Sequence, residues 1–394
     1  MKILYISTPP FFDMDLSLIK HLSPYCEIIY LLDIPPYHHK STALNIENGY
    51  PNNGIFKADI YCELSGWEEY IESERFYVIN RTSKMKLSPT NIWLQKTITN
   101  FISEVNPDLV HIANFVDIDY LLPMLKFRKR MLVTIHDPIS HSGEYSWRKM
   151  FTRNMNYTLI KNVVILNKNQ LEIFRKNTNK YHLKNIFVSS LGIYEYLNKY
   201  KNGTKKTNKK FNFLFFGRVS PYKGIDLLLK AFSDIENQHA NVKLIVAGSG
   251  EYWFDISTYK QYENIEIINR YIPNQELVAL IEQSSVVVCP YKDATQSGVV
   301  MSAFAFHKPI IATRTGGLPE MITDGETGYL VTANDAEALK NQMIYVLEHK
   351  EELNAITENI RKKYTSKNES WTMICQRLFE NYKKILSRTH INSI

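Results

Sequence analysis

The sequence is poor in cysteine and contains no long apolar run. Its four cysteines are scattered through 394 residues, and no two of them have Cys-x-x-Cys spacing. This scatter predicts buried thiols in a reducing compartment rather than disulfides or a zinc site. The sequence contains no run of about 18 apolar residues, so we expect no transmembrane helix. The start, MKILYISTPPFF, is typical of a first strand and lacks the cleavage site of a signal peptide, so we expect a cytoplasmic protein.

Basic residues outnumber acidic ones only slightly, 47 against 40, which gives a formal net charge of +7. They gather at positions 126–130, 201–210 and 361–363. No nucleic-acid-binding motif accompanies these clusters, so we expect no nucleic-acid partner. Two interpretations of the clusters stay open. They form an ordinary solvated surface, or they attract an anionic membrane and make the protein peripheral to the inner face of the cytoplasmic membrane.

Strand and helix signals alternate along the whole chain, which predicts an α/β fold with parallel sheets. A chain of 394 residues is long enough for two domains with separate cores. The expected strands are Ile3–Ser7, Glu27–Leu32, Asp108–Ala113, Met131–His136 and Val163–Asn167 in the first half, and Phe213–Gly217, Lys243–Gly248, Ile265–Asn269, Val286–Pro290 and Pro309–Thr313 in the second. The lysine-rich segment 199–210 predicts a linker between domains of residues 1–198 and 211–368. The polar segment His38–Gly54 predicts a loop.

The segment Phe211–Gly224, FNFLFFGRVSPYKG, predicts a phosphate-binding loop. Its apolar run is typical of a buried parallel strand and ends at Gly217. Arg218 and Lys223 follow, just before a helix expected from Ile225. An arginine, a lysine and a helix N-terminus together supply positive charge for two phosphates. Basic loop residues are also common in proteins that bind no phosphate, so this segment by itself leaves an ordinary surface loop open.

A second anion site is predicted within residues 285–331, where a helix begins near Gly298 after a buried strand. Amides at a helix N-terminus lack internal acceptors and carry partial positive charge. Gly298 would let a ligand approach the backbone closely. Ser297 has two open interpretations, a phosphate ligand or a simple N-cap. The order of pieces continues with Gly316-Gly317, Pro319-Glu320 and the turn DGETG at 324–328.

These pieces, in this order, resemble the C-terminal domain of retaining glycosyltransferase family 4, which has the GT-B architecture. The resemblance covers the C-terminal half well and the N-terminal half loosely. It implies two doubly wound Rossmann-like domains that face each other across a cleft, with a C-terminal helix at 369–394 that returns to the first domain. It also implies transfer of a sugar from a nucleoside-diphosphate sugar to a glycan or lipid-linked acceptor, in surface-polysaccharide biosynthesis. No cofactor is expected, and no metal, because Arg218, Lys223 and the helix N-terminus already supply positive charge.

The resemblance assigns roles to individual residues. His136, in the segment THDP, would contact the donor sugar near the reacting carbon, although a polar histidine at a strand end is also an ordinary structural feature. Arg218 and Lys223 would stabilise the leaving diphosphate. The expected donor-binding residues are Gly217, Gly248, Tyr271, Ile272, Gln296, Ser297, Gly298, Val299, Ser302 and Glu320, and the expected acceptor-side residues are Pro10, Phe11 and Asn114. Trp253 stands where a dinucleotide-binding fingerprint after Gly248 would need its third glycine, which argues against that motif.

The sequence departs from the family pattern at the second anion site. The family has two glutamates eight positions apart, and here Ala294 and Ser302 occupy those positions. The inner glutamate normally holds the donor ribose, and a serine makes only a weaker, uncharged contact, which leaves Gln296 as a candidate replacement. His307 stands where glycine is usual. Two alternative functions therefore stay open: a GT-B sugar-nucleotide epimerase, and a degenerate member that binds nucleotide or glycan without catalysis.

Two further patterns have competing interpretations. The triplets Asp13-Met14-Asp15 and Asp117-Ile118-Asp119 spell the DxD motif that binds a metal in GT-A enzymes, but such triplets are frequent by chance and the surrounding pattern is GT-B. Trp147, Met150, Phe151 and Met155 form an apolar stripe beside Arg148, Lys149 and Arg153. We favour a core-facing helix for this stripe over a helix that lies on a membrane surface.

Overall fold

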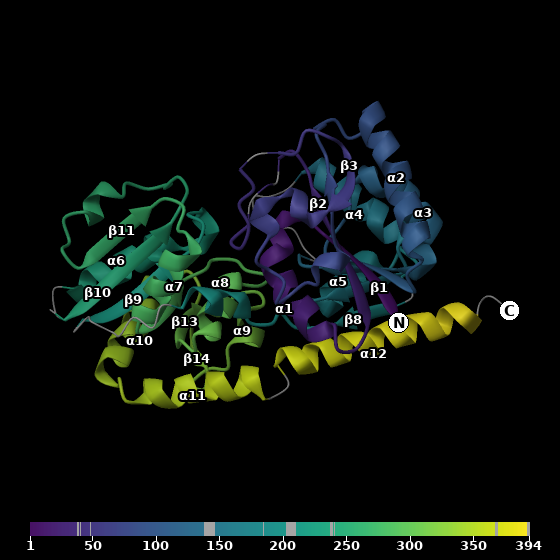
Figure 1. Cartoon of the computed structure of the whole chain (residues 1–394). Coiled ribbons are helices and arrows are strands. Elements are labelled where there is room, and N and C mark those ends of the chain that lie inside the picture. The colour runs from purple at the N-terminus through teal and green to yellow at the C-terminus, as the bar shows by residue number, and fades with distance from the viewer. Residues whose placement is uncertain are drawn as a thin grey trace. The chain divides into compact units, whose positions relative to one another are not determined.

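The computed structural model describes residues 1–37, 39, 41–47, 49–137, 146–183, 185–201, 210–236, 239, 241–366 and 369–391 (Figure 1). The chain divides into two compact units. The first unit contains Met1–Gly192 and Trp371–Ile394, and the second contains Ile193–Ser370. The second unit thus begins at Ile193, before the predicted linker at 199–210, and most of that linker lies outside the described residues. No helix in the described ranges is long and apolar enough to cross a membrane.

The first unit is built on an eight-stranded sheet in the order β3-β4-β2-β1-β5-β6-β7-β8. The strands are β1 (Lys2–Ser7), β2 (Glu27–Ile34), β3 (Gly54–Lys57), β4 (Phe76–Asn80), β5 (Leu109–Ile112), β6 (Met131–Ile135), β7 (Asn162–Ile165) and β8 (Asn185–Val188). Only the edge strand β3 runs antiparallel to its neighbour among these strands. β3, β4 and β8 were not predicted. Chain order reverses between β1 and β5, so this pair forms the topological switch point of a doubly wound sheet.

Several α-helices of the first unit pack around this sheet, and most of them bury an apolar face. They are α1 (Phe12–Leu22), α2 (Pro89–Val105), α3 (Leu121–Phe127), α4 (Trp147–Leu159), α5 (Leu171–Thr178) and α12 (Trp371–Ile391). In α2 the i, i+4 series Leu94, Ile98 and Ile102 is fully buried, as one face of a helix requires. The C-terminal helix α12 packs against α1, and its Tyr382 hydroxyl lies 2.6 Å from Nδ1 of His111 on β5.

The expectation of a core-facing stripe on α4 is wrong for the first turns of that helix. Trp147 and Phe151 are 67% and 52% exposed, and Met150 is exposed as well. Only Met155 of the stripe packs against the core. The buried face of α4 is instead made by Asn156 and Tyr157, because the Asn156 side-chain amide donates to the carbonyl of Val116 at 2.7 Å. This polar contact, together with the buried ring of Tyr157, therefore docks the C-terminal half of the helix.

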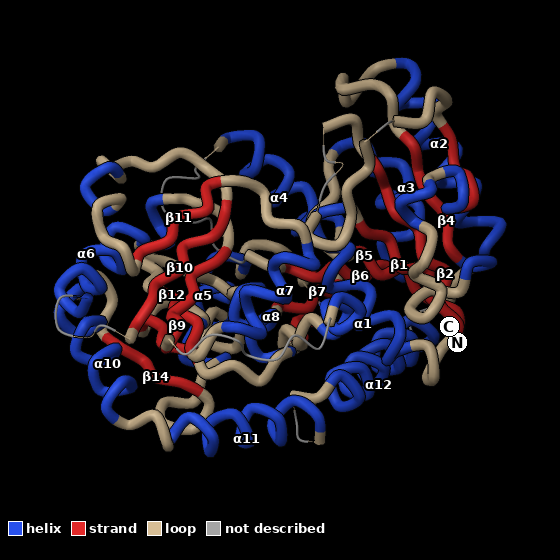
Figure 2. The backbone as a smooth tube through the Cα atoms, turned by 60° about the vertical axis from the view of Figure 1, so that its left-hand side comes forward, coloured by secondary structure: helices blue, strands red, loops and turns tan. Residues whose placement is uncertain are grey.

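The second unit has a six-stranded, fully parallel sheet in the order β11-β10-β9-β12-β13-β14. Its strands are β9 (Phe211–Phe216), β10 (Val242–Gly248), β11 (Ile265–Asn269), β12 (Val286–Cys289), β13 (Ile310–Thr313) and β14 (Gly328–Val331), of which β14 was not predicted. Its helices are α6 (Ile225–Glu236), α7 (Asn274–Gln283), α8 (Gly298–Ala305), α9 (Leu318–Met321), α10 (Ala336–Glu348) and α11 (Glu352–Thr365). Figure 2 shows α6 and α10 together on one side of this sheet and α7 and α8 on the other.

This strand order is the Rossmann order, with its switch point between β9 and β12. Ligands of such sheets bind at the carboxyl ends of the two strands that flank the switch point. The fold therefore directs attention to the loop that leaves β9 and to the loop that joins β12 to α8. In the first unit the equivalent position lies between the loops that follow β1 and β5.

Candidate functional site

At the switch point of the second unit, three loops meet through glycine backbone. A Cβ atom on Gly248, at the end of β10, would lie 1.7 Å from the carbonyl oxygen of Gly217, at the end of β9. Gly224 has φ +68°, and a Cβ there would lie 1.9 Å from the carbonyl oxygen of Pro290, after β12. Neither distance is compatible with a side chain. These glycines therefore bring the ends of β9, β10 and β12 into contact.

Lys223 lies at the centre of this arrangement, on the short 3₁₀ helix η8 (Pro221–Lys223). Its side chain is buried, with Nζ 3.7 Å from the ring centroid of Tyr291. Burial lowers the pKa of Lys223 to about 8, and the neighbouring charge of Arg218 acts in the same direction. Arg218 is exposed, and neither cation forms an ion pair with a carboxylate in the described part of the chain. An ammonium group that is desolvated without a carboxylate is suited to an anionic ligand.

Helix α8 begins beside the same loops. The Ser297 hydroxyl accepts a hydrogen bond from the amide of Val300 at 3.3 Å, so this serine is the N-cap of α8. The Cγ2 atom of Val299 lies 3.3 Å from where a Cβ of Gly217 would stand. The first turn of α8 and its amides therefore lie next to the β9 loop. A Cβ on Gly298 would lie 2.9 Å from the Tyr194 hydroxyl, so a larger residue there would require the Tyr194 side chain to shift.

The first unit has a cavity of about 530 Å³ at its own switch point, and the three predicted acceptor-side residues, Pro10, Phe11 and Asn114, all line it. His136 lies behind this lining, with its ring stacked on Phe11 at 4.4 Å between centroids. Nε2 of His136 lies 2.9 Å from the carbonyl oxygen of Ala113. Burial lowers the pKa of His136. In the neutral ring the Nε2 proton is donated to that carbonyl, which leaves Nδ1 as an acceptor.

Residues 198–363 match the family model described as glycosyl transferases group 1. These residues form a glycosyl transferases group 1 domain. An uncharacterised glycosyltransferase of Methanocaldococcus jannaschii is 33% identical over 165 residues, which are 41% of this chain and 45% of that protein. An uncharacterised protein in the cps region of Klebsiella pneumoniae is 32% identical over 142 residues, 34% of this chain and 36% of that protein. The chain thus matches less than half the length of these relatives.

Solved structures extend the similarity to both units. A sucrose-phosphate synthase from Thermosynechococcus elongatus has a TM-score of 0.69 at 15% identity, with 98% of this chain and 100% of that chain covered. The Anabaena protein HepE, in complex with UDP and glucose, has a TM-score of 0.66 at 17% identity, with coverage of 98% and 100%. The fold is therefore GT-B, with two Rossmann-like units, as the resemblance implied.

The predicted donor residues are unevenly distributed over the group 1 domain. Gly217, Lys223, Gly248 and Ser297–Val299 come together at the switch point. Tyr271 and Ile272 follow the edge strand β11, the first exposed and the second buried, and Glu320 is exposed on α9. The structure does not bring these three into the glycine contacts.

The two positions where the group 1 domain lacks glutamate are both buried. Ala294 is 3% exposed, and its carbonyl oxygen accepts from the amide of Gly317 at 3.0 Å. Ser302 is 4% exposed within α8, whereas Gln296 is half-buried. His307 has φ +55°, a left-handed conformation after the end of α8. This conformation explains why glycine is usual at that position, because only glycine adopts it without strain.

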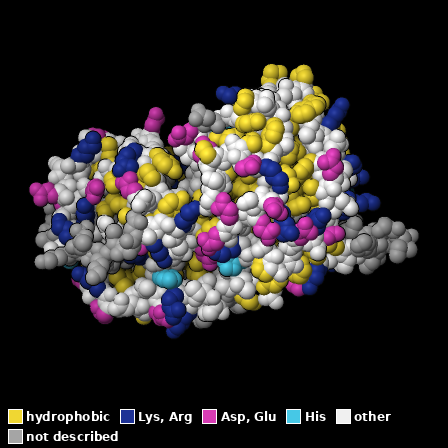
Figure 3. Space-filling model, viewed as in Figure 1, with side chains coloured by type: hydrophobic (Ala, Val, Ile, Leu, Met, Phe, Trp, Pro, Cys, Tyr) yellow, Lys and Arg dark blue, Asp and Glu magenta, His cyan; other side chains and the backbone are white. Residues whose placement is uncertain are grey.

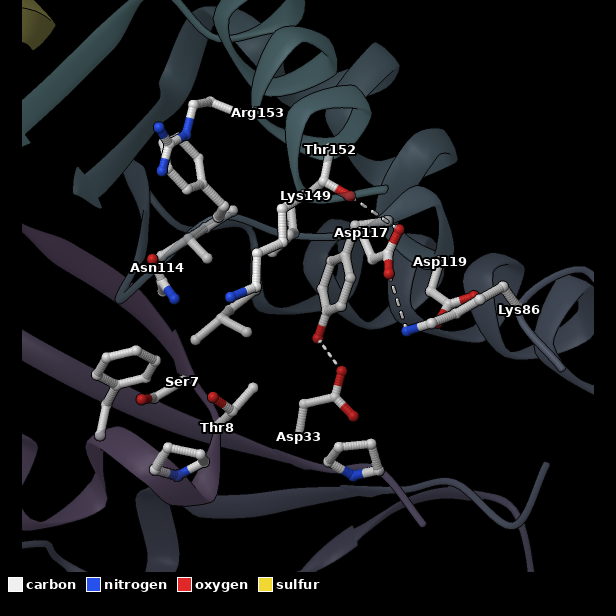
Figure 4. Close-up of a pocket in the computed structure, with 18 of the residues that line it drawn as sticks. Ser7, Thr8, Asp33, Lys86, Asn114, Asp117, Asp119, Lys149, Thr152 and Arg153 are labelled. Atoms are coloured by element: carbon white, nitrogen blue, oxygen red, sulfur yellow. Dashed lines mark hydrogen bonds and ion pairs between the residues drawn. The ribbon is translucent and has the colours of Figure 1, made fainter. Parts of the chain in front are cut away.

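Three charged residues that line the cavity of the first unit, Asp33, Arg81 and Lys86, were not predicted from the sequence. Nε of Arg81 donates to Oδ1 of Asp33 at 2.7 Å. Nζ of Lys86 lies 3.0 Å from Asp117 and 3.2 Å from Asp119, and Figure 4 shows these three residues together. Asp33 and Arg81 stand at the carboxyl ends of β2 and β4, and recognition of β4 would have been the signal for Arg81.

The two DxD triplets lie in different environments. Asp117 and Asp119 are paired with Lys86, whereas Asp15 is buried in α1 and accepts from the hydroxyls of Tyr5 at 3.0 Å and Tyr30 at 2.8 Å. Burial raises the pKa of Asp15 to about 7. Within the described ranges, no group of three or more His, Cys, Asp or Glu side chains is arranged to hold a metal ion.

Proposed function

We propose that the protein is a retaining glycosyltransferase that moves a sugar from a nucleoside-diphosphate sugar to a hydroxyl of a glycan or lipid-linked saccharide. The observation that carries this proposal is Lys223, a buried ammonium group at the switch point of a group 1 domain, with no carboxylate partner among the residues that the structure describes. A diphosphate placed there would meet Lys223, Arg218 and the amides of α8. The likeness to a structure that holds UDP and glucose supports this class of donor.

The proposed chemistry depends on charge stabilisation at the leaving group. As the bond between the anomeric carbon and the diphosphate breaks, negative charge grows on the departing phosphate oxygen. The acceptor hydroxyl attacks the same face of the sugar, and the departing phosphate takes its proton. Lys223 and Arg218 stabilise the new charge, and removal of one such donor costs about 100-fold or more in rate. His136 keeps the role that the resemblance implies, contact with the donor sugar. These cations make a metal ion unnecessary in this proposal.

The setting of the reaction is part of the same proposal. The relative in the cps region supports a role in surface-polysaccharide biosynthesis. A peripheral position at the cytoplasmic membrane would bring the enzyme to lipid-linked acceptors, and the net charge of +7 favours an anionic surface.

The test is calorimetric binding of UDP, GDP and ADP in the presence of a chelator. We expect one nucleotide to bind the wild type, about 100-fold weaker binding by Lys223→Ala and by Arg218→Ala, and no change in Lys340→Ala, a control on α10. Absence of binding to any nucleotide would contradict the proposal. Incubation with the matching sugar nucleotide then separates the alternatives. An epimerase converts the donor without an acceptor, a transferase needs one, and a non-catalytic member does neither.

A further inference from the structure

The cavity of the first unit has two chemically different walls (Figure 4). One wall comes from strand ends and from the segment before α3, and its charged residues are Asp33, Arg81, Lys86, Asp117 and Asp119. Three carboxylates and two cations there are paired with one another. The other wall comes from α4 and contributes Arg148, Lys149 and Arg153, with Asp137 as the carboxylate beside them. Among the described lining residues, the first wall has three carboxylates against two cations, and the second has three cations against one carboxylate.

The first wall offers donors and acceptors side by side. The Arg81 side chain is 3% exposed, and Nε is held by Asp33, but Nη1 and Nη2 have no hydrogen-bond partner among the described residues. Oδ1 of Asp119 is likewise buried without a partner, and its Oδ2 lies 4.0 Å from Nη1 of Arg81. Buried polar groups normally have partners, so these atoms are suited to a ligand that both donates and accepts. A sugar hydroxyl does both.

The second wall supplies positive charge from one helix. Figure 4 shows the Lys149 side chain extending from α4 into the cavity, with Arg153 one turn further along. Nη2 of Arg153 donates to the carbonyl oxygen of Asp137 at 3.0 Å, and its guanidinium lies 5.6 Å from the ring centroid of Phe115. Arginine and lysine side chains in this arrangement are suited to phosphate oxygens, which accept charge-assisted hydrogen bonds.

The opposite side of the same helix is apolar and exposed. Trp147, Met150 and Phe151 follow the i, i+3, i+4 spacing of one helix face, and their exposed fractions are 67%, 46% and 52%. Most large exposed apolar residues of the described chain belong to the first unit, where Figure 3 shows apolar side chains at the surface. A helix with an apolar outer face and basic neighbours is typical of contact with a lipid interface.

We propose that this cavity binds the acceptor as a lipid-linked sugar phosphate. The sugar occupies the wall of Asp33, Arg81 and Asp119, and the phosphate contacts Lys149 and Arg153. From the phosphate, the lipid passes around α4 and lies against Trp147, Met150 and Phe151 on its outer face. A volume of about 530 Å³ suits a monosaccharide with its phosphate. This inference rests on the proposed function and selects the lipid-linked class from its two acceptor classes.

The test measures binding of the full-length protein to three probes at one ionic strength. The first is phosphatidylcholine vesicles that contain polyprenyl-diphosphate-linked glucose. The second is phosphatidylcholine vesicles with phosphatidylglycerol at equal negative charge. The third is glucose 1-phosphate in solution. We expect at least tenfold stronger binding to the first vesicles than to the second. Binding of glucose 1-phosphate should be detectable and weaker, because it reaches both walls but not the lipid-facing side.

Two variants separate the parts of the site. Lys149→Ala should weaken binding of the lipid-linked probe about fivefold and should also weaken binding of glucose 1-phosphate. Phe151→Ser should weaken vesicle binding about tenfold and leave binding of glucose 1-phosphate unchanged. The matched controls are Lys176→Ala and Ile173→Ser on α5, since Ile173 is 49% exposed and thus similar to Phe151. Both controls should behave as wild type.

Several results would overturn the inference. Equal binding to the two vesicle types would indicate a general anionic surface, and equal losses in the α5 variants would indicate nonspecific adsorption. A wild-type dimer that Phe151→Ser converts to a monomer in sedimentation would show that the apolar face joins two copies of this chain. Nucleotide binding in the same preparations keeps the two proposals apart. A protein that binds nucleotide but not the lipid-linked probe fails only this inference.

Discussion

The two units place their candidate sites at the same topological position but build them from different material. In the group 1 domain, the site is made of backbone, because Gly217, Gly224 and Gly248 bring strand ends together and helix α8 supplies amides. In the first unit, the site is made of side chains from strand ends and α4, held by the ion pair of Asp33 and Arg81. A backbone site suits a ligand of constant chemistry such as a diphosphate.

The largest expected effect comes from breaking the side-chain site. Arg81→Met leaves Asp33 buried, with the Tyr120 hydroxyl, at 2.6 Å, as its remaining side-chain partner among the described residues. Removal of one member of a buried pair costs about 3–5 kcal/mol of unfolding free energy. The control is Arg75→Met at the other end of β4, because Arg75 is 41% exposed in its pair with Glu72. We expect about 0–1 kcal/mol for that variant in urea denaturation. Similar losses in both variants would contradict the contrast between the two sites.

The same contrast explains which of the two sites could be predicted from the sequence. The run FNFLFF and the following Gly217, Arg218 and Lys223 form a local pattern, so the loop of the group 1 domain was predictable from neighbouring residues. Asp33 and Arg81 are 48 residues apart and meet only after β4 pairs with β2, a contact that no local pattern encodes. The amphipathic period of α4 likewise predicts an apolar face but not what covers it, since Asn156 docks the helix instead.

The backbone site is broken by a single methyl group. Gly248→Ala places a Cβ within 1.7 Å of the carbonyl oxygen of Gly217, so the β9 loop must move. We expect a loss of about 3 kcal/mol in unfolding free energy and loss of nucleotide binding. Gly325→Ala is the control, because Gly325 has φ +75° but nothing within 4 Å of its added Cβ. That variant should lose about 1 kcal/mol, from the left-handed backbone alone, and bind nucleotide normally. Normal nucleotide binding by Gly248→Ala would contradict the assignment.

The pH dependence of nucleotide affinity tests the charge state of Lys223 in the backbone site. Its pKa of about 8 in the free protein means that the ammonium form, which binds phosphate, predominates at pH 7, is half populated near pH 8 and is lost above it. Nucleotide affinity should therefore fall as pH rises from 7 to 9, towards tenfold per pH unit above 8. Burial raises the pKa of the neighbouring Cys289 to about 11, so that thiol stays neutral in this window. Lys223→Arg keeps its charge and should show a flat profile by calorimetry. A wild-type profile that is equally flat would remove Lys223 from the site.

The smallest expected effect comes from a comparison of two N-cap serines, one in each unit. Ser297 caps α8 and Ser88 caps α2 (Pro89–Val105), each accepting from the amide three residues later, at 3.3 Å and 3.2 Å. Replacement of either serine by alanine should cost about 1 kcal/mol of unfolding free energy, because one amide loses its acceptor. Only Ser297→Ala should also change nucleotide affinity, since α8 lies at the switch point of the group 1 domain. Equal nucleotide affinity in the two variants would mean that the start of α8 serves the fold and not the ligand.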